Sequence, residues 1–319
     1  MIKAQDVQKW FGPNLVVDHV SFEVQSGEVL GFLGPNGAGK STTMRMLTGF
    51  LPLSGGKIDI DGHDIETDPI AAKALVGYLP ENAPAYNDMT VEGFLAFCAA
   101  IRGFSGNEQT QAVEKAIETC HLQKVRRQNI ETLSKGYFHR CCFAQAILHD
   151  PPVLVLDEPT DGLDPNQKHE MRMLIRDMGK SKAIIVSTHI LEEVEAICSR
   201  VIIIDQGKLV FNGSPADLRA RSTDAGAVQV RIHHVPFADI RSTLGAIAGA
   251  GAVNQLGEDG QAITVLVQRK DSAVALAPAI KTVLDKHQWH FDELHTESGR
   301  LDDVFRTITS LDSAKENKA

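Results

Sequence analysis

Cysteine is scarce in this sequence, and its few residues form no disulfide or zinc pattern. The five cysteines are an odd number, and no two of them are spaced as C-x-x-C. Disulfide-rich secreted scaffolds and small zinc domains depend on such pairs. The pattern therefore disfavours both classes, and we expect reduced thiols that are buried or partly buried.

Long hydrophobic runs and an excess of positive charge are also missing. No uninterrupted apolar stretch approaches the roughly 18 residues that a bilayer span needs, and the start of the chain has no signal-peptide core. The formal net charge is -9 at pH 7, which argues against a broad surface for nucleic acid. We therefore expect a cytoplasmic protein with no nucleic-acid partner.

What the sequence does contain is a glycine-rich loop that matches the phosphate-binding pattern G-x-x-x-x-G-K-[ST]. Its residues are Gly34, Pro35, Asn36, Gly37, Ala38, Gly39, Lys40, Ser41 and Thr42. The apolar run 29–33 before it predicts a buried strand, and a helix is expected from about Lys40. The backbone N–H groups of such a turn and the positive end of the helix dipole attract phosphate.

This loop makes nucleotide binding the starting hypothesis, with an ordinary glycine turn before a helix as the alternative. The glycines allow positive φ or a close approach to an anion. In such a site Lys40 reaches the β and γ phosphates of ATP, and the Ser41 hydroxyl binds Mg²⁺.

Two further apolar runs end in polar residues that suit the same chemistry. The run 153–156 leads into Asp157 and Glu158, and the run 183–188 leads into His189. Ligands of parallel sheets gather at the carboxyl ends of the strands. Adjacent acids at a strand end are often only surface charges, and a lone histidine there is usually structural. The phosphate loop upstream favours a functional site here, with an acid that holds Mg²⁺.

The length of the chain and its changes of periodicity predict an α/β protein with two domains. Antiparallel strands open the chain, and a helical subdomain interrupts the α/β pattern. A polar stretch without periodicity, 219–226, marks the domain boundary. After it the order β-α-β-β-α-β indicates a ferredoxin-like α+β domain. We predict an α/β domain at 1–220 with its helical block at about 88–150, the ferredoxin-like domain at 221–312 with a last helix from Leu301 to Ile308, and a frayed tail at 313–319.

Five motifs stand in one fixed order along the first domain. They are the phosphate loop, Leu133-Ser134-Lys135-Gly136-Tyr137, Val155-Leu156-Asp157-Glu158-Pro159-Thr160, Asp161-Gly162-Leu163-Asp164 and Ser187-Thr188-His189. In this order they resemble the P-loop cassette of an ABC transporter, over about residues 1–220. The amino-acid sequences of 162–167 and of 299–305 resemble those of the gliding-motility and multidrug export type of ABC transporter.

The resemblance implies a role for each matching residue. ATP and Mg²⁺ are the implied cofactors. Phe11 would stack on adenine, with Trp10 as the second choice. Asp157 would steady the metal, Glu158 would polarise the attacking water, and His189 would contact the γ-phosphate.

Other matching residues would act between two copies of the cassette. Ser134 and Gly136 would reach the nucleotide held by the other copy, and Asp164 would link the two sites. The chain departs from the family at Glu81, which replaces a glutamine and would bind the metal or the water while adding negative charge. In the Leu-Ser-Lys-Gly-Tyr motif, Lys135 and Tyr137 replace the usual glycine and glutamine.

The resemblance also implies partners. Two cassettes, as a homodimer or a mixed pair, would bind ATP head to tail and drive a separate integral-membrane permease, docked near Glu81 and 88–110. The chain would then lie peripherally on the inner face of the membrane. The competing class is a soluble ABC-type mechanoenzyme that acts on ribosomes or DNA. For the C-terminal domain, we favour a packing or dimer-stabilising appendage over a small-molecule sensor.

Overall fold

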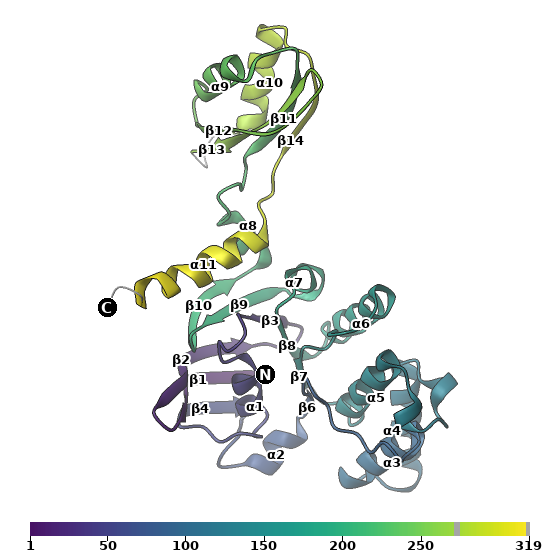
Figure 1. The fold of residues 1–319 in the computed structure, drawn as a ribbon. Coiled ribbons are helices and arrows are strands. Elements are labelled where there is room, and N and C mark those ends of the chain that lie inside the picture. Colours follow the sequence, from purple (N-terminus) through teal and green to yellow (C-terminus); the bar gives the residue numbers. More distant parts are fainter. Residues whose placement is uncertain (271–274, 317–319) are drawn as a thin grey trace. The chain divides into compact units, whose positions relative to one another are not determined.

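The computed structural model describes residues 1–270 and 275–316, with side chains described up to residue 309. The chain divides into two compact units, Met1–Pro215 and Ala216–Ala319, each of which carries its own sheets and helices (Figure 1). The two units are described separately.

The first unit is built around a six-stranded sheet in the order β10-β9-β3-β8-β7-β6. Its strands are β3 (Val29–Leu33), β6 (Val76–Leu79), β7 (Val153–Asp157), β8 (Ala183–Thr188), β9 (Arg200–Asp205) and β10 (Lys208–Gly213). The ladders from β9 to β6 are parallel, and β10 joins the edge antiparallel. All residues of β3, β7 and β8 are buried. Such continuous apolar strands are typical of a parallel sheet that is covered on both faces.

A second sheet of four strands is antiparallel, as the alternating start of the sequence predicts. Its order is β2-β1-β4-β5, with β1 (Ile2–Phe11), β2 (Asn14–Val24), β4 (Gly55–Ile60) and β5 (His63–Asp64). One hydrophobic core joins the two sheets, and in it the rings of Phe22 and Phe32 lie 5.7 Å apart. Strand β3, which precedes the glycine-rich loop, is therefore paired with β8 and β9 and also packed against the second sheet.

The helices of the first unit cover these sheets and form the predicted helical block. They are α1 (Lys40–Leu47), α2 (Pro69–Ala74), α3 (Val91–Ile101), α4 (Gly106–Thr119), α5 (Lys135–Ile147), α6 (Pro165–Met178) and α7 (Leu191–Ile197), with short 3-10 turns at Gln123–Val125 and Ile130–Thr132. Helices α3, α4 and α5 pack together as the block. Ser134 caps α5, since its side chain accepts from the Tyr137 N–H.

The second unit follows the order strand, helix, strand, strand, helix, strand. Its elements are α8 (Pro215–Ala220, which begins at the end of the first unit), β11 (Val228–His233), α9 (Phe237–Gly245), β12 (Ala250–Asp259), β13 (Ala262–Arg269), α10 (Leu276–Lys286), β14 (Phe291–Thr296) and α11 (Leu301–Glu316). The sheet order is β12-β13-β11-β14, and all neighbouring strands are antiparallel. Its own core includes Val230, Ile240 and Ile280.

The predicted end of the last helix differs from the structure. The last helix does not end at Ile308 but continues to Glu316, because no proline or glycine interrupts the sequence there. It therefore takes in part of the tail expected from residue 313, while 317–319 lie outside the described residues. Residues 271–274, before α10, also lie outside the described residues.

All five cysteines are free, as the sequence predicts. Cys120, Cys141, Cys142 and Cys198 are buried, and Cys98 is half-buried. Burial raises the pKa of Cys98 to about 11 and the pKa of Cys120, Cys142 and Cys198 to about 12. Within 1–270 and 275–316, no helix has the length and the apolar character that a membrane crossing requires.

Candidate functional site

The glycine-rich loop joins the carboxyl end of β3 to the first turn of α1. Gly39 precedes the helix with φ 104°, a conformation that side chains other than glycine rarely adopt. A hydrogen bond from the turn after β9 also holds the loop, since the Gly207 N–H donates to the Ala38 carbonyl at 3.0 Å. Gly34 packs so closely on Ile204 that a Cβ would lie 2.3 Å from the Ile204 carbonyl oxygen. The backbone of the loop is thus fixed by neighbours on another strand.

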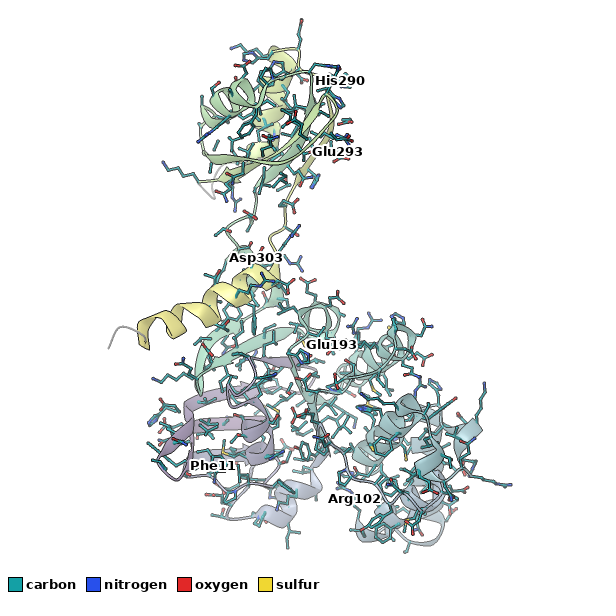
Figure 2. All side chains as sticks on the ribbon, in the orientation of Figure 1. Phe11, Arg102, Glu193, His290, Glu293 and Asp303 are labelled. Atoms are coloured by element: carbon teal, nitrogen blue, oxygen red, sulfur yellow. The ribbon has the colours of Figure 1, made fainter. Side chains whose placement is uncertain are left out.

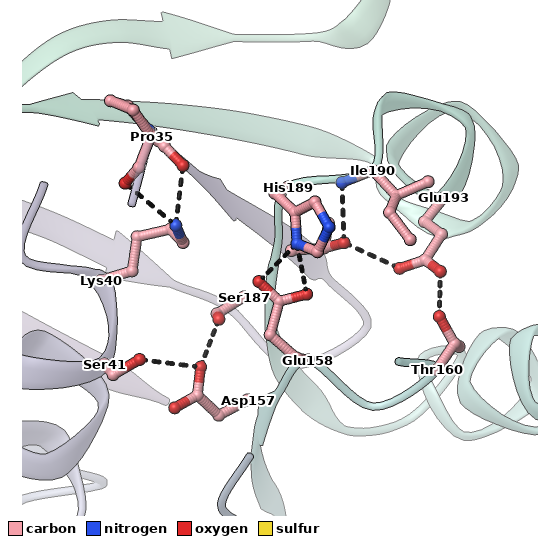
Figure 3. Close-up of polar contacts among 12 residues, drawn as sticks. Pro35, Lys40, Ser41, Asp157, Glu158, Thr160, Ser187, His189, Ile190 and Glu193 are labelled. Carbon is pink, nitrogen blue, oxygen red and sulfur yellow. Dashed lines mark hydrogen bonds and ion pairs between the residues drawn. The ribbon is translucent and has the colours of Figure 1, made fainter. Parts of the chain in front are cut away.

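Lys40 is folded back onto this loop. Its Nζ donates to the Gly34 carbonyl at 2.7 Å and to the Pro35 carbonyl at 3.2 Å, and the residue is only 7% exposed (Figure 3). Burial lowers the pKa of Lys40, and the negative charges of Glu158, Asp157 and Glu81 oppose that effect. The ammonium group is therefore held in place at the mouth of the loop, close to three carboxylates.

Ser41 and Asp157 meet across the ends of α1 and β7. The Ser41 Oγ donates to the Asp157 Oδ1 at 3.4 Å, and the Ser187 hydroxyl donates to the same oxygen. Asp157 is 3% exposed and pairs with Ser187 in the β7–β8 ladder. A hydroxyl and a carboxylate in contact offer the oxygen ligands that Mg²⁺ prefers. The residues present therefore fit a magnesium ion at this position.

Glu158 and His189 lie together at the ends of β7 and β8. The His189 Nδ1 is 3.0 Å from both carboxylate oxygens of Glu158. Burial raises the pKa of Glu158, and His189 and Lys40 oppose the rise. Glu158 has φ +50°, in the left-handed region. This conformation is unfavourable for a residue with a side chain, so the surrounding structure fixes the direction of the carboxylate.

These groups line one open pocket of about 510 Å³. Its walls are Val16, Asn36, Gly37, Gly39, Lys40, Ser41, Thr42, Glu81, Glu158, Asp161 and His189. Nine of these are among the site residues that the sequence predicts, while Val16 and Asp161 were not selected. Asp161 follows the acidic strand within a recognised motif, so position alone could have identified it. Val16 carries no chemical signal, and it reaches the pocket because the backbone of β2 packs close to Gly39 of the loop.

The remaining predicted residues lie outside the lining of this pocket. The carbonyls of Gly34 and Pro35 accept from Lys40, and Asp157 accepts from Ser41. The Ala38 carbonyl accepts from the Gly207 N–H. Phe11 lies at the end of β1 (Figure 2). Phe11 and its neighbour Trp10 are 47% and 46% exposed. The Lys9 Nζ lies 5.3 Å from the centre of the Phe11 ring.

Ser134, Gly136 and Asp164 also lie elsewhere in the same unit. Ser134 caps α5, and Asp164 caps α6 by accepting from the Gln167 N–H at 2.9 Å. A Cβ on Gly136 would meet the side chain of Gln167. A separate pocket of about 470 Å³ includes Asp164, Gln167 and Tyr137 in its lining. The chain therefore does not bring these three predicted residues to its own phosphate loop.

Sequence comparisons identify a family and several relatives. The family described as ABC transporter matches residues 17–161. The chain is 35% identical over 225 residues to the probable multidrug ABC transporter ATP-binding protein YbhF of Escherichia coli, covering 70% of this chain but only 39% of that protein. It is 32% identical over 233 residues to the linearmycin resistance ATP-binding protein LnrL of Bacillus subtilis, covering 73% and 75%. It is 36% identical over 248 residues to the Nod factor export ATP-binding protein I of Burkholderia lata, covering 77% and 81%.

Solved structures share the fold of the first unit. A structure titled as the ATP binding subunit of an ABC transporter has a TM-score of 0.64 and 28% identity, and covers 69% of this chain and 92% of that one. The cassette MJ0796, described as a dimer in a post-hydrolysis state with ADP and Pi, has a TM-score of 0.62 at 20% identity, with 67% and 99% covered. Because the second structure is only 20% identical to this chain, it shows that the fold is shared and nothing more.

Proposed function

This chain belongs to the ABC transporter family, and on that premise we propose that it is the ATP-hydrolysing subunit of an exporter. The observation that carries the proposal is the convergence of Lys40, Ser41, Glu158 and His189 on one pocket. Relatives whose names mention multidrug transport, linearmycin resistance and Nod factor export support the direction of transport. The acidic net charge of -9 disfavours the alternative, a mechanoenzyme on ribosomes or DNA.

In this proposal the phosphate loop holds the triphosphate. The loop N–H groups and Lys40 bind the phosphate oxygens, and Lys40 exchanges its carbonyl partners in the loop for those oxygens. Ser41 and Asp157 would hold Mg²⁺, with Glu81 as a further oxygen ligand. When bound there, the ion would supply positive charge that offsets the negative charge of the triphosphate.

Hydrolysis then depends on Glu158 and His189. Glu158 accepts a hydrogen bond from the attacking water, aligns it with the γ-phosphate and takes up its proton as general base. As the water oxygen bonds to phosphorus, the bond to the ADP oxygen breaks, which gives ADP and inorganic phosphate. His189 orients the Glu158 carboxylate through the 3.0 Å contacts, and we assign it a contact with the γ-phosphate. Phosphoryl transfer needs such positioning more than it needs covalent chemistry.

The proposal includes a head-to-tail pair of cassettes. Ser134, Gly136 and Asp164 lie apart from the pocket of their own chain, which agrees with a role at the nucleotide of a second copy. Phe11 is exposed enough to stack on adenine. Loss of the γ-phosphate on hydrolysis would weaken the interface between the copies.

The proposed membrane partner is a separate permease, with this chain peripheral on the inner face of the membrane. We place its docking surface near Glu81 and 88–110. Beside this segment Tyr86 is 53% exposed and packs edge-on against Phe97 at 5.2 Å. Aromatic residues of this kind are enriched at protein interfaces.

The test of the proposed function is Glu158→Gln in the full chain. We expect turnover of ATP with magnesium to fall about 10²- to 10⁴-fold, the usual effect of losing a general base, while ATP still binds. Glu118→Gln, at an exposed glutamate of α4, is the matched control. Wild-type turnover in Glu158→Gln, or no magnesium-dependent hydrolysis by the unmodified protein, would contradict the proposal.

A further inference from the structure

Glu193, on α7, is a buried carboxylate that the reaction above does not use. It is 1% exposed. The Thr188 hydroxyl donates to its Oε2 at 2.9 Å, and the Thr160 hydroxyl donates to its Oε1 (Figure 3). The Arg172 Nη2 lies 3.7 Å from Oε1. A buried charge is costly unless it is paired and hydrogen-bonded, and both oxygens of Glu193 have a hydroxyl donor.

The two threonines belong to the two segments that carry the reacting groups. Thr160 stands two residues after Glu158, and Thr188 immediately precedes His189. The Thr188 hydroxyl also accepts from the Ile190 N–H at 3.0 Å, so it fixes the backbone on both sides of His189. Glu193 therefore joins the loop after β7 to the loop after β8.

The contacts of Glu193 with Thr160 and Thr188 lie next to the backbone that carries Glu158 and His189. The backbone of Glu158 is tied to Ser187, since the Glu158 N–H donates to the Ser187 carbonyl at 3.0 Å. Glu158 nevertheless has a left-handed φ, and the His189 side chain is 53% exposed. An unfavourable backbone conformation persists only where neighbouring contacts hold it. The hydroxyl bonds to Glu193 are such contacts, two residues from Glu158 and one residue from His189.

We infer that Glu193 is a positioning residue, which holds the Glu158 and His189 loops in register so that both face the γ-phosphate. The inference rests on the proposed function and assigns it a residue outside the five motifs. Arg172 supplies the neighbouring positive charge. Its distance is longer than a charge-assisted hydrogen bond of about 2.7–2.9 Å, so the threonine hydroxyls are the main partners.

The first test compares Glu193→Gln with Glu192→Gln, the same change at the exposed neighbour on α7. Because displacements near 1 Å can cost about 10²-fold in rate, we expect kcat for ATP to fall roughly 10- to 100-fold in Glu193→Gln. The dissociation constant for ATP should change less than about threefold, since the phosphate loop is untouched. Glu192→Gln should retain wild-type kinetics.

The second test separates positioning from packing at Thr160. Thr160→Val keeps the shape of the side chain but removes the hydroxyl, and Thr160→Ser keeps the hydroxyl but removes a methyl group. We expect Thr160→Val to reproduce the loss of kcat and Thr160→Ser to retain most of the rate. The effects of Thr160→Val and Glu193→Gln should not add in the double variant, because they remove the same contact. The reverse order, with Ser worse than Val, would mean that only packing matters.

Amide hydrogen exchange gives a readout that does not depend on hydrolysis. We expect faster exchange in 158–162 and 187–190 of Glu193→Gln than in the wild-type chain or in Glu192→Gln. Wild-type kcat together with unchanged exchange would overturn the inference and leave the proposed function intact. Absence of hydrolysis by the wild-type chain would overturn the proposed function, and unchanged exchange would still refute the coupling of the two loops.

Discussion

Gly34→Ala tests whether the phosphate loop depends on its close contact with β9. The new Cβ would lie 2.3 Å from the Ile204 carbonyl oxygen, whereas real Cβ atoms essentially never come within 3.0 Å of another heavy atom. The loop and the strand must therefore move apart by at least about 0.7 Å, which is the difference between these two distances. Ile204 is fully buried in the sheet, so we expect the loop to move rather than the strand.

A shift of this size should be visible in nucleotide affinity. Misplacements near 1 Å cost about 10²-fold where geometry matters, so we expect the dissociation constant for ATP to rise roughly 10- to 100-fold. Overpacking should also lower stability by about 1–3 kcal/mol. Titration with a fluorescent ATP analogue measures the affinity, and thermal unfolding measures the stability.

Gly62→Ala is the control for strain without a clash. Gly62, in the β4–β5 turn, has φ +92° and no heavy atom within 4 Å of a Cβ position. A side chain in that conformation costs about 1–2 kcal/mol, which is comparable with the loss expected at Gly34. Gly62→Ala should therefore be destabilised and still bind ATP normally. Wild-type affinity in Gly34→Ala, or an equal loss in both variants, would refute the reasoning.

Three further predictions follow. Lys40→Ala should raise the dissociation constant for ATP about 10- to 100-fold, through loss of a charged hydrogen bond of roughly 1.5–3 kcal/mol; a titration that shows less than a twofold change would exclude this role. Ser134→Arg should abolish ATPase activity of the assembled complex while nucleotide still binds the separate chain, and intact activity would disprove the action in trans. Burial lowers the pKa of His149 to about 4 from the ordinary value of 6.5, and the Arg102 guanidinium donates to its Nε2 at 2.8 Å. As the pH falls, His149 takes up a proton in the unfolded chain before it does so in the folded chain. The free energy of unfolding is therefore highest above pH 6.5 and falls as the pH approaches 4. Because His149 is only partly buried, solvent screening reduces this loss, so between pH 7 and pH 5 it should be about 1 kcal/mol, and His149→Gln should remove it in urea unfolding measured at both pH values.

The sequence was informative where function depends on local pattern. The loop from Gly34 to Thr42, the acids after β7 and His189 after β8 are each marked by a run of adjacent residues. The parallel sheet then brings the three segments to one edge because its strands end there.

Other parts of the site depend on long-range contacts that no local pattern encodes. Glu193 meets Thr160 across 33 positions of sequence, and Val16 reaches the pocket only through the packing of β2. The left-handed backbone of Glu158 is likewise imposed by its surroundings, since no glycine or asparagine marks it. The limit of α11 was missed for a different reason, because residues 309–316 are mostly polar and contain only one large apolar residue, Leu311.

The shielding of the cysteines has a practical consequence for following the motions of this protein. A maleimide dye reacts with a thiolate, and thiols with a pKa of about 11 or 12 supply almost none at neutral pH. Labels attached at one new surface cysteine, at pH 7 and for short times, should therefore report on that position above a low background. Fluorescence or spin-label distance measurements during the ATP cycle can thus begin from the natural sequence, without first replacing its own cysteines.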